Sequence, residues 1–277
     1  MAKDRVITIE EIEKNPEGCL DKAPHWGTKV SKLVLLTHNK EEGGLGLLLI
    51  KRGEKVYWPG HWSFPGGHQK HGETNIRTAT REAASELGKR DVKLAVLGTL
   101  KPVFSIEGHE ITPVVAMIDD TNFSIKSLKP KRREVAEIRV IPIEQIFNKS
   151  AYRRTDFRQN NVSGREKAKK KKFAGDGRFY QVEHLDLGHG IEGYDVELSF
   201  INATIVRELA ECFEWDINLL RDTINQRSSG KLAPLKLHPP TEIDSPEPKD
   251  SGEVNKRKCW VAVHFDTIDP RGRSHTR

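Results

Sequence analysis

A short segment that begins with paired glycines carries acidic and basic residues at fixed intervals. Five residues separate Gly67 from Glu73, and seven separate Glu73 from Arg81. Glu82, Glu86 and Gly88 follow and complete the segment. On a helix, Glu82 and Glu86 are four residues apart, so both carboxylates lie on one side. Mg²⁺ commonly takes one or two carboxylates together with water and substrate phosphates. The spacing therefore predicts a metal site that activates water for attack at phosphorus.

The same segment predicts the helix that positions these carboxylates. From Glu73 onward, apolar residues recur on one helical face at Ile76, Ala79, Ala83 and Leu87. Gly88 then provides the signal that ends the helix. The carboxylates lie beside this apolar stripe, so we expect the helix to pack on a sheet while the carboxylates project into a cleft. We also expect Arg81 to pair with Glu73 and fix the loop against the helix.

These residues resemble the motif of the Nudix family, Gly-x5-Glu-x7-Arg-Glu-apolar-x-Glu-Glu-x-Gly-apolar. The resemblance implies an α/β fold in which a mixed sheet is sandwiched between helices (α/β/α). It implies pyrophosphohydrolase activity, with Arg81 and Glu73 in the catalytic group and Mg²⁺ or Mn²⁺ bound by Glu82, Glu86 and Gly67. Two positions depart from the motif. Ser85 replaces the first residue of the Glu-Glu pair, which removes one carboxylate and weakens the prediction of an enzyme, and Lys89 replaces the last apolar residue.

The resemblance extends beyond this motif to the coenzyme A pyrophosphatase branch of the family. It covers Lys32 to Leu209, about two thirds of the chain. The stretches that carry it are Phe64–Gly67 preceded by Gly60, Leu97–Ile118, Arg133–Ile146 and, more loosely, Leu198–Leu209. The resemblance implies a coenzyme A-type substrate. The residues just before Phe64 differ from those of the branch, which leaves this selectivity open.

Several residues outside the motif are candidates for substrate contacts. Arg52 ends a predicted strand and is a candidate phosphate clamp, although a surface arginine is the commoner outcome. Trp58 and Trp62 can stack on a nucleobase or close the core. Glu134, preferred over Glu137, is a candidate for the remote carboxylate that many Nudix sites bring to the metal or the water; the alternative is a surface glutamate paired with a neighbouring arginine.

Alternating and periodic apolar residues predict the remaining elements. Lys32–His38 and Leu45–Arg52 read as a β-hairpin, and the Gly/Pro/Trp-rich stretch at 55–67 reads as an irregular loop. Further strands are expected at Val92–Leu100, Glu110–Ile118, Val135–Ile141 and Phe179–Leu187, with a short helix at Pro142–Phe147. Residues 199–227 keep apolar positions at steps of three or four and predict one long helix.

The chain divides by composition into three parts. Residues 1–28 read as an irregular lead-in with a short helix near Glu10–Lys14, 29–227 as the catalytic domain, and 228–277 as a Pro/Ser/charged linker and tail in which Cys259–Phe265 can form a strand. The domain holds a basic insertion at about 149–178. Within it, Lys149–Lys172 contains ten basic and two acidic residues, which is typical of a mobile surface loop that can also attract RNA or a polyphosphate.

Composition excludes two classes of protein. The chain has 277 residues, 36% of them hydrophobic, and a net charge of +6. No apolar run approaches the ~18 residues of a membrane-spanning helix. Three cysteines without paired spacing indicate neither a disulfide framework nor a cysteine zinc site and favour an intracellular, reducing compartment, either the cytoplasm or an organelle such as the mitochondrion. The start of the chain lacks the apolar core of a signal peptide. The sequence does not indicate an oligomeric state.

Three hypotheses about function remain from the sequence. The first is metal-dependent hydrolysis of a nucleoside diphosphate linked to another moiety, with coenzyme A-type compounds favoured. The second keeps this chemistry but acts on a nucleoside triphosphate or an RNA 5′ end. The third is a catalytically weakened RNA-binding or ribonucleoprotein subunit, which the serine at 85 and the basic insertion favour.

Overall fold

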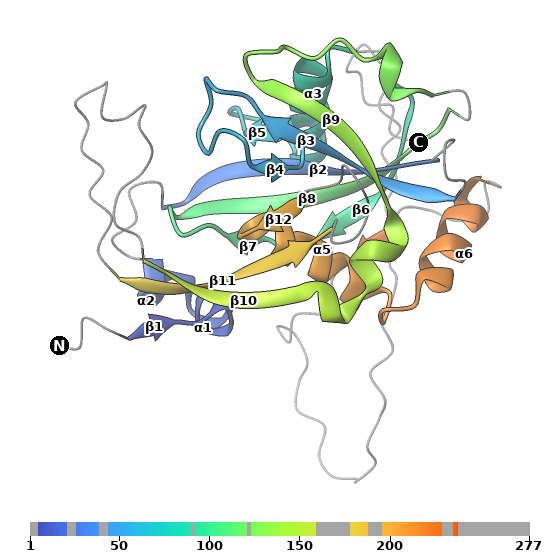
Figure 1. Ribbon diagram of the computed structural model, residues 1–277. Coiled ribbons are helices and arrows are strands. Elements are labelled where there is room, and N and C mark those ends of the chain that lie inside the picture. Colours follow the sequence, from blue (N-terminus) through green and yellow to red (C-terminus); the bar gives the residue numbers. More distant parts are fainter. Residues whose placement is uncertain are drawn as a thin grey trace, which may run out of the picture.

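The protein is described by a computed structural model in which residues 5–20, 26–38, 44–89, 92–120, 123–158, 178–187, 196–228 and 235–237 are placed. Figure 1 shows a large mixed sheet. Its strands run in the order β13-β6-β8-β2-β3-β4, with β5 on β2, β7 on β8 and β9 on β3. Its strands are β2 (Thr28–His38), β3 (Leu45–Arg52), β4 (Trp62–Ser63), β5 (Gly66–His68), β6 (Leu94–Leu100), β7 (Val103–Phe104), β8 (His109–Ile118), β9 (Val135–Pro142) and β13 (Leu235–Leu237).

A second, smaller sheet lies against the first. It runs β1-β11-β10, with β12 on β11. Its strands are β1 (Val6–Ile7), β10 (Tyr152–Arg158), β11 (Phe179–Asp186) and β12 (Glu197–Ser199). The α-helices are α1 (Ile9–Lys14), α2 (Pro16–Leu20), α3 (Asn75–Leu87), α5 (Ile201–Cys212) and α6 (Ile217–Ser228), and the 3₁₀ turns are η1 (Ile125–Ser127), η2 (Ile143–Phe147) and η3 (Lys149–Ala151).

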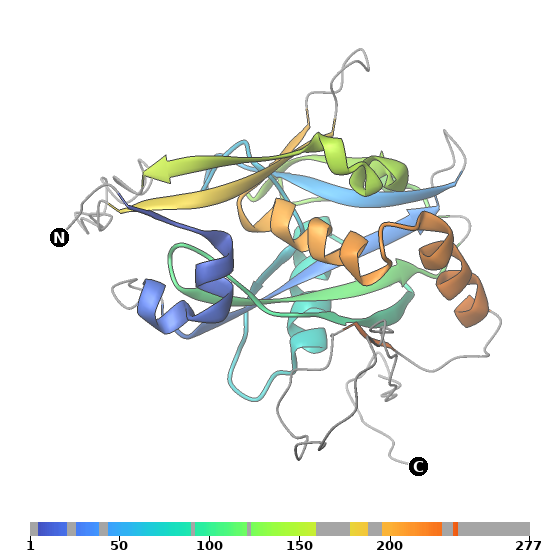
Figure 2. The same ribbon diagram turned by 90° about the horizontal axis from the view of Figure 1, so that it is seen from below.

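The two faces of β2 bury side chains against different helices. Leu33 and Leu35 belong to the core cluster that contains the apolar face of α3, whereas Val34 and Leu36 belong to the cluster that contains α5. This follows from the strand geometry, since successive side chains point to opposite faces of a sheet. Figure 2 shows α5 on the near side of the large sheet and α3 behind it. The α/β/α arrangement expected from the sequence is confirmed, as is the hairpin of β2 and β3.

The prediction of one long helix at 199–227 is wrong, because the chain forms two helices, α5 and α6, in this region. The break at 213–216 contains two residues with left-handed backbone, Glu214 at φ 52° and Trp215 at φ 61°. The ring of Trp215 packs edge-on against Tyr152, with centroids 5.5 Å apart. Both helices still bury the periodic apolar residues, among them Leu209 and Leu220. Periodicity alone therefore could not distinguish one helix from two.

Three segments expected to be irregular contain regular structure. In the lead-in, α1 matches the short helix predicted near Glu10–Lys14, and β1 pairs with β11. The Trp-rich loop contains β4 and β5, and the start of the basic insertion forms η3 and β10. For β1, β5 and β10 the partner strand lies well outside the segment itself, and local patterns do not reveal such pairing. The rest of the insertion (159–177) and the segment Cys259–Phe265 lie outside the described residues.

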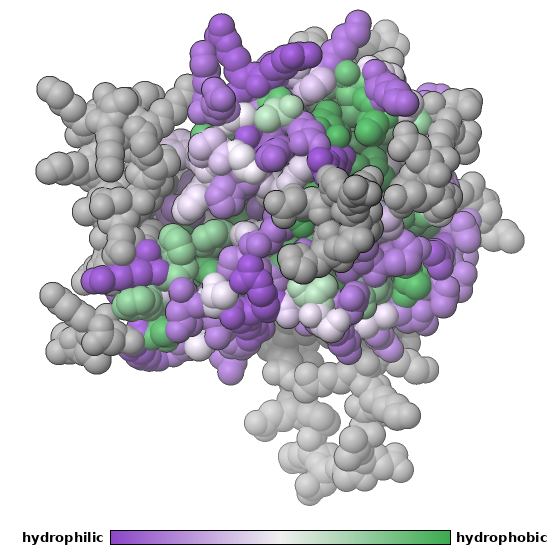
Figure 3. All heavy atoms as spheres, in the orientation of Figure 1, coloured by the Kyte–Doolittle hydropathy of each residue, from purple (hydrophilic) through white to green (hydrophobic). Residues whose placement is uncertain are grey.

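The described surface is mainly polar. On the face shown in Figure 3, apolar residues form separate patches between polar residues. The large apolar side chains with the greatest exposure are Trp26, Tyr57 and Leu219. No helix among the described residues is long and apolar enough to cross a membrane.

Candidate active site

Both ends of α3 are fixed by specific residues. The side chain of Thr74 accepts a hydrogen bond from the backbone N–H of Arg77 (3.2 Å), which caps the first turn. Gly88 ends the helix in the left-handed conformation at φ 68°. A Cβ at Gly88 would lie 1.7 Å from the carbonyl oxygen of Lys129, so glycine is required by space as well as by conformation. This close approach fixes how α3 lies against the rest of the chain.

The two carboxylates of α3 meet the backbone of β5. The N–H of Gly66 donates a hydrogen bond of 2.9 Å to Oε2 of Glu86. Gly67 lies so close to Glu82 that a Cβ there would be 2.7 Å from the carboxyl carbon. Because β5 pairs with β2, the sheet holds this glycine backbone in place. Glu82 and Glu86 therefore converge on one short stretch of the chain, as the sequence predicted.

Glu73 and Arg81 form the ion pair expected from the sequence. The guanidinium contacts both carboxylate oxygens of Glu73, with Nε–Oε1 at 2.7 Å and Nη2–Oε2 at 2.8 Å. Thr78 and the N–H of Lys70 also donate to this carboxylate. The hydrogen bond from Arg81 is the main reason that the pKa of Glu73 falls from 4.5 to about 2. Arg81 also pairs with Glu82, so it links the loop to a catalytic candidate.

The depressed pKa of Glu73 predicts how the stability of the fold depends on pH. A carboxyl group that loses its proton more easily in the folded state stabilises that state above its unfolded pKa, and this stabilisation is lost as pH falls towards the folded pKa. We expect Glu73→Gln to lower the denaturant midpoint clearly at pH 7. The difference from the unmodified chain should shrink below pH 4.5 and vanish near pH 2. Glu144→Gln, which removes an exposed ion pair with Arg221, is the control. A Glu73→Gln difference that is independent of pH would contradict the assignment.

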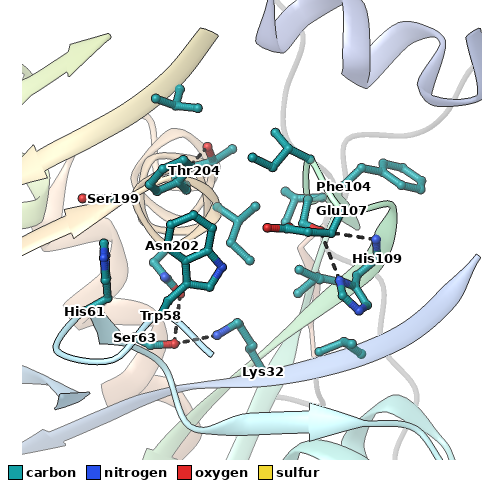
Figure 4. Close-up of a pocket in the computed structure, with 18 of the residues that line it drawn as sticks. Lys32, Trp58, His61, Ser63, Phe104, Glu107, His109, Ser199, Asn202 and Thr204 are labelled. Atoms are coloured by element: carbon teal, nitrogen blue, oxygen red, sulfur yellow. Dashed lines mark hydrogen bonds between the residues drawn. The ribbon is translucent and has the colours of Figure 1, made fainter. Parts of the chain in front are cut away.

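Glu86 faces a cavity of about 510 Å³. One end of the cavity is formed by the Gly66–Gly67 backbone, Lys32 and Arg52. The lining on the other sides comes from α1, from the turn between β7 and β8, and from β11, β12 and α5. Figure 4 shows Trp58 and Asn202 on one side of this space, Glu107 and His109 on the opposite side, and Lys32 at its base. Polar groups are thus concentrated around a space large enough for an extended ligand.

Two cations lie near Glu86 at the polar end of the cavity. Nζ of Lys32 donates to Oγ of Ser63 at 2.6 Å, and Nε of Arg52 donates to the carbonyl oxygen of Tyr57 at 2.6 Å. Burial is the main cause that raises the pKa of Glu86, and the two cations oppose this rise. Burial, together with the charge of Arg52, lowers the pKa of Lys32 to about 7, against the opposing effect of Glu86. The three groups therefore share one partly dehydrated environment.

The structure separates the other residues selected from the sequence. Arg52 and Trp58 line the cavity. Trp62 is only 4% exposed and packs in the main core, so its ring does not face the cavity. Glu134 is not among the lining residues, and its exposed side chain lies 3.7 Å from Nζ of Lys131. The structure thus favours the alternative of a surface ion pair for Glu134, with a lysine in the place of the expected arginine. Glu137 pairs with Arg139 and likewise lies outside the lining.

The donors around Glu82 and Glu86 fit a hard divalent cation. Nowhere in the described ranges do three or more His, Cys, Asp or Glu side chains cluster as a metal site. Mg²⁺ needs fewer protein ligands than that, because water and substrate phosphates complete its shell. Within the described residues, no hydrogen bond engages Oε2 of Glu82 or Oε1 of Glu86. These two oxygens and the backbone at Gly67 can therefore hold Mg²⁺ or Mn²⁺.

Ser85 is held by a lysine. Nζ of Lys131 donates a 2.7 Å hydrogen bond to its Oγ. The same ammonium lies near Glu134. Where the Nudix motif has an additional carboxylate, this chain therefore has a neutral hydroxyl beside the ammonium of Lys131. A negative charge is missing at this position and a positive charge lies next to it.

Sequence reasoning missed Lys32, Ser63 and Asn202 as residues of the site. Ser63 donates to Oδ1 of Asn202 (3.3 Å), and Asn202 in turn donates to the carbonyl oxygen of Trp62 (3.4 Å). Asn202 is 139 residues from Ser63 in sequence, so only the fold brings them together. For Lys32 there was a signal: it lies within a strand whose next four residues, Leu33–Leu36, are all buried. A charged residue in such a run is buried only where it has a partner or a function.

Comparisons with known proteins agree with this geometry. A model of the NUDIX domain matches residues 28–160. A protein of Pectobacterium atrosepticum named as the uncharacterised Nudix hydrolase NudL is 36% identical over 109 residues, which cover 38% of this chain and 54% of that protein. The peroxisomal coenzyme A diphosphatase NUDT7 of Mus musculus is 28% identical over 201 residues, which cover 70% of this chain and 80% of that protein. The chain thus spans about half the length of the bacterial relative.

A solved structure of a Nudix hydrolase from M. Smegmatis, RenU, is also similar. Its sequence is 26% identical, the TM-score is 0.36, and the match covers 43% of this chain and 72% of that one.

Proposed function

The chain belongs to the Nudix family, and from this premise we propose that it is a divalent-metal-dependent diphosphatase for nucleoside diphosphates linked to a second moiety. Coenzyme A-type compounds are the favoured substrates. The observation that carries the proposal is that Glu82 and Glu86 converge on the Gly66–Gly67 backbone. This backbone, Glu86 and the partly exposed Arg52 line the 510 Å³ cavity, and Glu82 lies just behind the lining, against Gly67. A phosphoric anhydride needs this combination of a metal site, a cationic clamp and space on either side of the diphosphate.

The residues of the polar end have separable roles in this proposal. Glu82, Glu86 and Gly67 hold Mg²⁺ or Mn²⁺. When bound, such an ion stabilises charge on the phosphoryl oxygens and lowers the pKa of a bound water. The Nη nitrogens of Arg52 make no hydrogen bond to the described residues and are available for phosphate oxygens. Arg81 and Glu73 act through their ion pair, which keeps Glu82 in position.

Trp58 is the candidate for contact with a nucleobase. Its backbone has a left-handed φ of 53°, which is unusual for a bulky residue. Its ring packs against Phe200, also left-handed at φ 57°, with centroids 5.3 Å apart. Both residues line the cavity. Strain of this kind persists where the surrounding structure imposes it, commonly at ligand sites. The rest of the cavity then remains for the second moiety of the substrate.

A substrate panel tests the proposal. The chain is incubated with Mg²⁺ and coenzyme A, ADP-ribose, GTP or a 5′-triphosphorylated RNA, and the products are separated by chromatography. We expect coenzyme A to give two products that each keep one phosphate of the broken anhydride, with no reaction in EDTA. Hydrolysis of GTP or RNA alone would move the substrate to the triphosphate hypothesis. No hydrolysis of any compound would contradict the enzyme and favour a binding subunit.

The RNA hypothesis depends on a segment that the structure describes only at its start. The basic residues described there already have intramolecular contacts. Arg153 pairs with Glu197 (2.9 Å) and Arg154 with Glu183 (3.4 Å). Lys149 lies over the ring of Trp215, and Arg158 lies over the ring of Phe179. Residues 165–172, which hold all the other basic residues of Lys149–Lys172, lie outside the described ranges. The pairing of the described bases favours the small-molecule proposal over RNA.

Restoring a glutamate at position 85 tests the effect of Lys131. The sequence alone predicts that Ser85→Glu tightens metal binding. Because Nζ of Lys131 already contacts Oγ of Ser85, the new carboxylate should pair with this lysine instead. We expect Ser85→Glu to change the Mn²⁺ affinity little, and Ser85→Glu combined with Lys131→Met to tighten it about tenfold, or about 1.4 kcal/mol. Mn²⁺ titration followed by electron paramagnetic resonance measures both. Equal tightening in the single and double variants would show that Lys131 does not compete.

A further inference from the structure

The most deeply buried cation of the cavity has no role in the chemistry proposed so far. Lys32 is 8% exposed and lies on the central strand β2. A buried ammonium is costly unless it is paired and hydrogen-bonded. In the described part of the chain, no carboxylate lies within 4 Å of its Nζ, since the residues that contact it are Ser63 and Phe64. The fold therefore buries this amino group without a contacting carboxylate.

The contacts of Lys32 fix its direction towards the cavity. An ammonium has three donors. One donates to Oγ of Ser63 at 2.6 Å, and a second makes a longer contact of 3.4 Å with the carbonyl oxygen of Phe64. Ser63 is held in turn by Asn202 on α5. Figure 4 shows these hydrogen bonds from Lys32 to Ser63 and from Ser63 to Asn202, with the ammonium at the base of the open space. The remaining donor is left for a ligand.

The charges at the polar end leave room for an anion. Glu86 is the carboxylate that favours the charged form of Lys32, and it also faces Arg52. One oxygen of Glu86 is occupied by the N–H of Gly66. If Glu86 serves as a metal ligand, its negative charge is shared with the metal. The side chains of Lys32 and Arg52 then remain without a contacting anion. A diphosphate group supplies that negative charge.

We propose that Lys32, together with Arg52, forms a binding site for the diphosphate group that does not require a metal, with Nζ of Lys32 donating directly to a phosphate oxygen. This rests on the proposed function for the identity of the ligand, but its test does not need turnover. Ser63 and Asn202 are positioning residues in this account, since they aim the ammonium and do not touch the ligand.

Binding of ADP in EDTA tests the proposal with the full chain. We expect Lys32→Met to weaken ADP binding by at least about tenfold, the loss typical of a hydrogen bond to a charged group. Lys29→Met is the matched control, because Lys29 is an exposed lysine on the same strand, and its affinity should change less than about twofold. Isothermal titration calorimetry measures the ADP affinity of the unmodified chain and of the two variants.

The thermal midpoint separates this role from a structural one. Removing a buried charge should leave the midpoint of Lys32→Met unchanged or raised while ADP binding falls. A lowered midpoint with unchanged ADP affinity would show a structural role and overturn the proposal. Ser63→Ala, which removes the hydroxyl that aims the ammonium, should weaken ADP binding to a smaller degree and provides a second variant if Lys32→Met does not fold.

The outcomes also separate this proposal from the proposed function. ADP binding that depends on Lys32, in a chain that hydrolyses no member of the panel, would keep the binding site and contradict the enzyme. Turnover with ADP affinity that is the same in Lys32→Met and in the unmodified chain would keep the enzyme and overturn the binding site. Failure of the unmodified chain to bind ADP in EDTA would also overturn it.

Discussion

Glu86→Gln should lower kcat for the anhydride substrate by a factor of roughly 10²–10⁴, the range for loss of a group that handles the attacking water or its metal. The fold should survive, because a glutamine oxygen can still accept the hydrogen bond from the N–H of Gly66. Removing a partly buried carboxylate whose pKa is already raised by burial also costs little stability. Steady-state kinetics with Mg²⁺, together with the thermal midpoint, measure both effects.

Two further variants show which carboxylate acts. Glu144→Gln removes an exposed glutamate paired with Arg221 and should leave kcat unchanged. Glu134→Gln removes the remote carboxylate considered from the sequence, which lies outside the cavity lining. If Glu134→Gln lost more activity than Glu86→Gln, the role of the base would move to Glu134, and the cavity would not be where the reaction takes place.

Gly67→Ala is the second change from which we expect a large loss of activity, of about 10²-fold. The added Cβ would lie 2.7 Å from the carboxyl carbon of Glu82 and 2.9 Å from its Cγ, so this side chain must shift. The end of a glutamate can move without disturbing the fold, whereas a misplacement of about 1 Å in a catalytic site can cost about a hundredfold in rate. Stability should therefore change much less than activity.

Gly72→Ala is the matched control for this change. Gly72 lies in the turn between β5 and α3 at φ 76°, and a Cβ there would meet nothing within 4 Å. Its replacement adds backbone strain of about 1 kcal/mol or more without touching Glu82. We expect Gly72→Ala to lower the thermal midpoint and to keep kcat. Comparable losses of kcat in the two variants would mean that general strain in the loop, not the position of Glu82, limits the reaction.

The sequence was most informative where local pattern and chemistry coincide. The interval from Gly67 to Gly88 predicted α3, its capping glycine and the convergence of Glu82 with Glu86, because all of these depend on residues within a few turns of each other. The strands β2 and β3 were also predictable, since their apolar runs are continuous and a short loop separates them.

What the sequence could not predict depends on contacts between distant segments. The pairing of β1 with β11 and the contact of Ser63 with Asn202 join residues that are more than a hundred positions apart. The two tryptophans show the same limit. Trp58 and Trp62 are four residues apart in a Gly/Pro-rich loop, and only the strand pairing of β4 with β3 turns one into the core and leaves the other in the cavity.

The position of a bound Mn²⁺ ion tests the central claim most directly. Crystals of the chain soaked with Mn²⁺ and ADP would locate the ion by its anomalous scattering. We predict one site within coordination distance of Glu82 and Glu86 and next to Gly67, with the diphosphate between the ion and Arg52. An ion bound elsewhere, with none at these two carboxylates, would contradict the assignment of the cavity as a metal-dependent diphosphatase site.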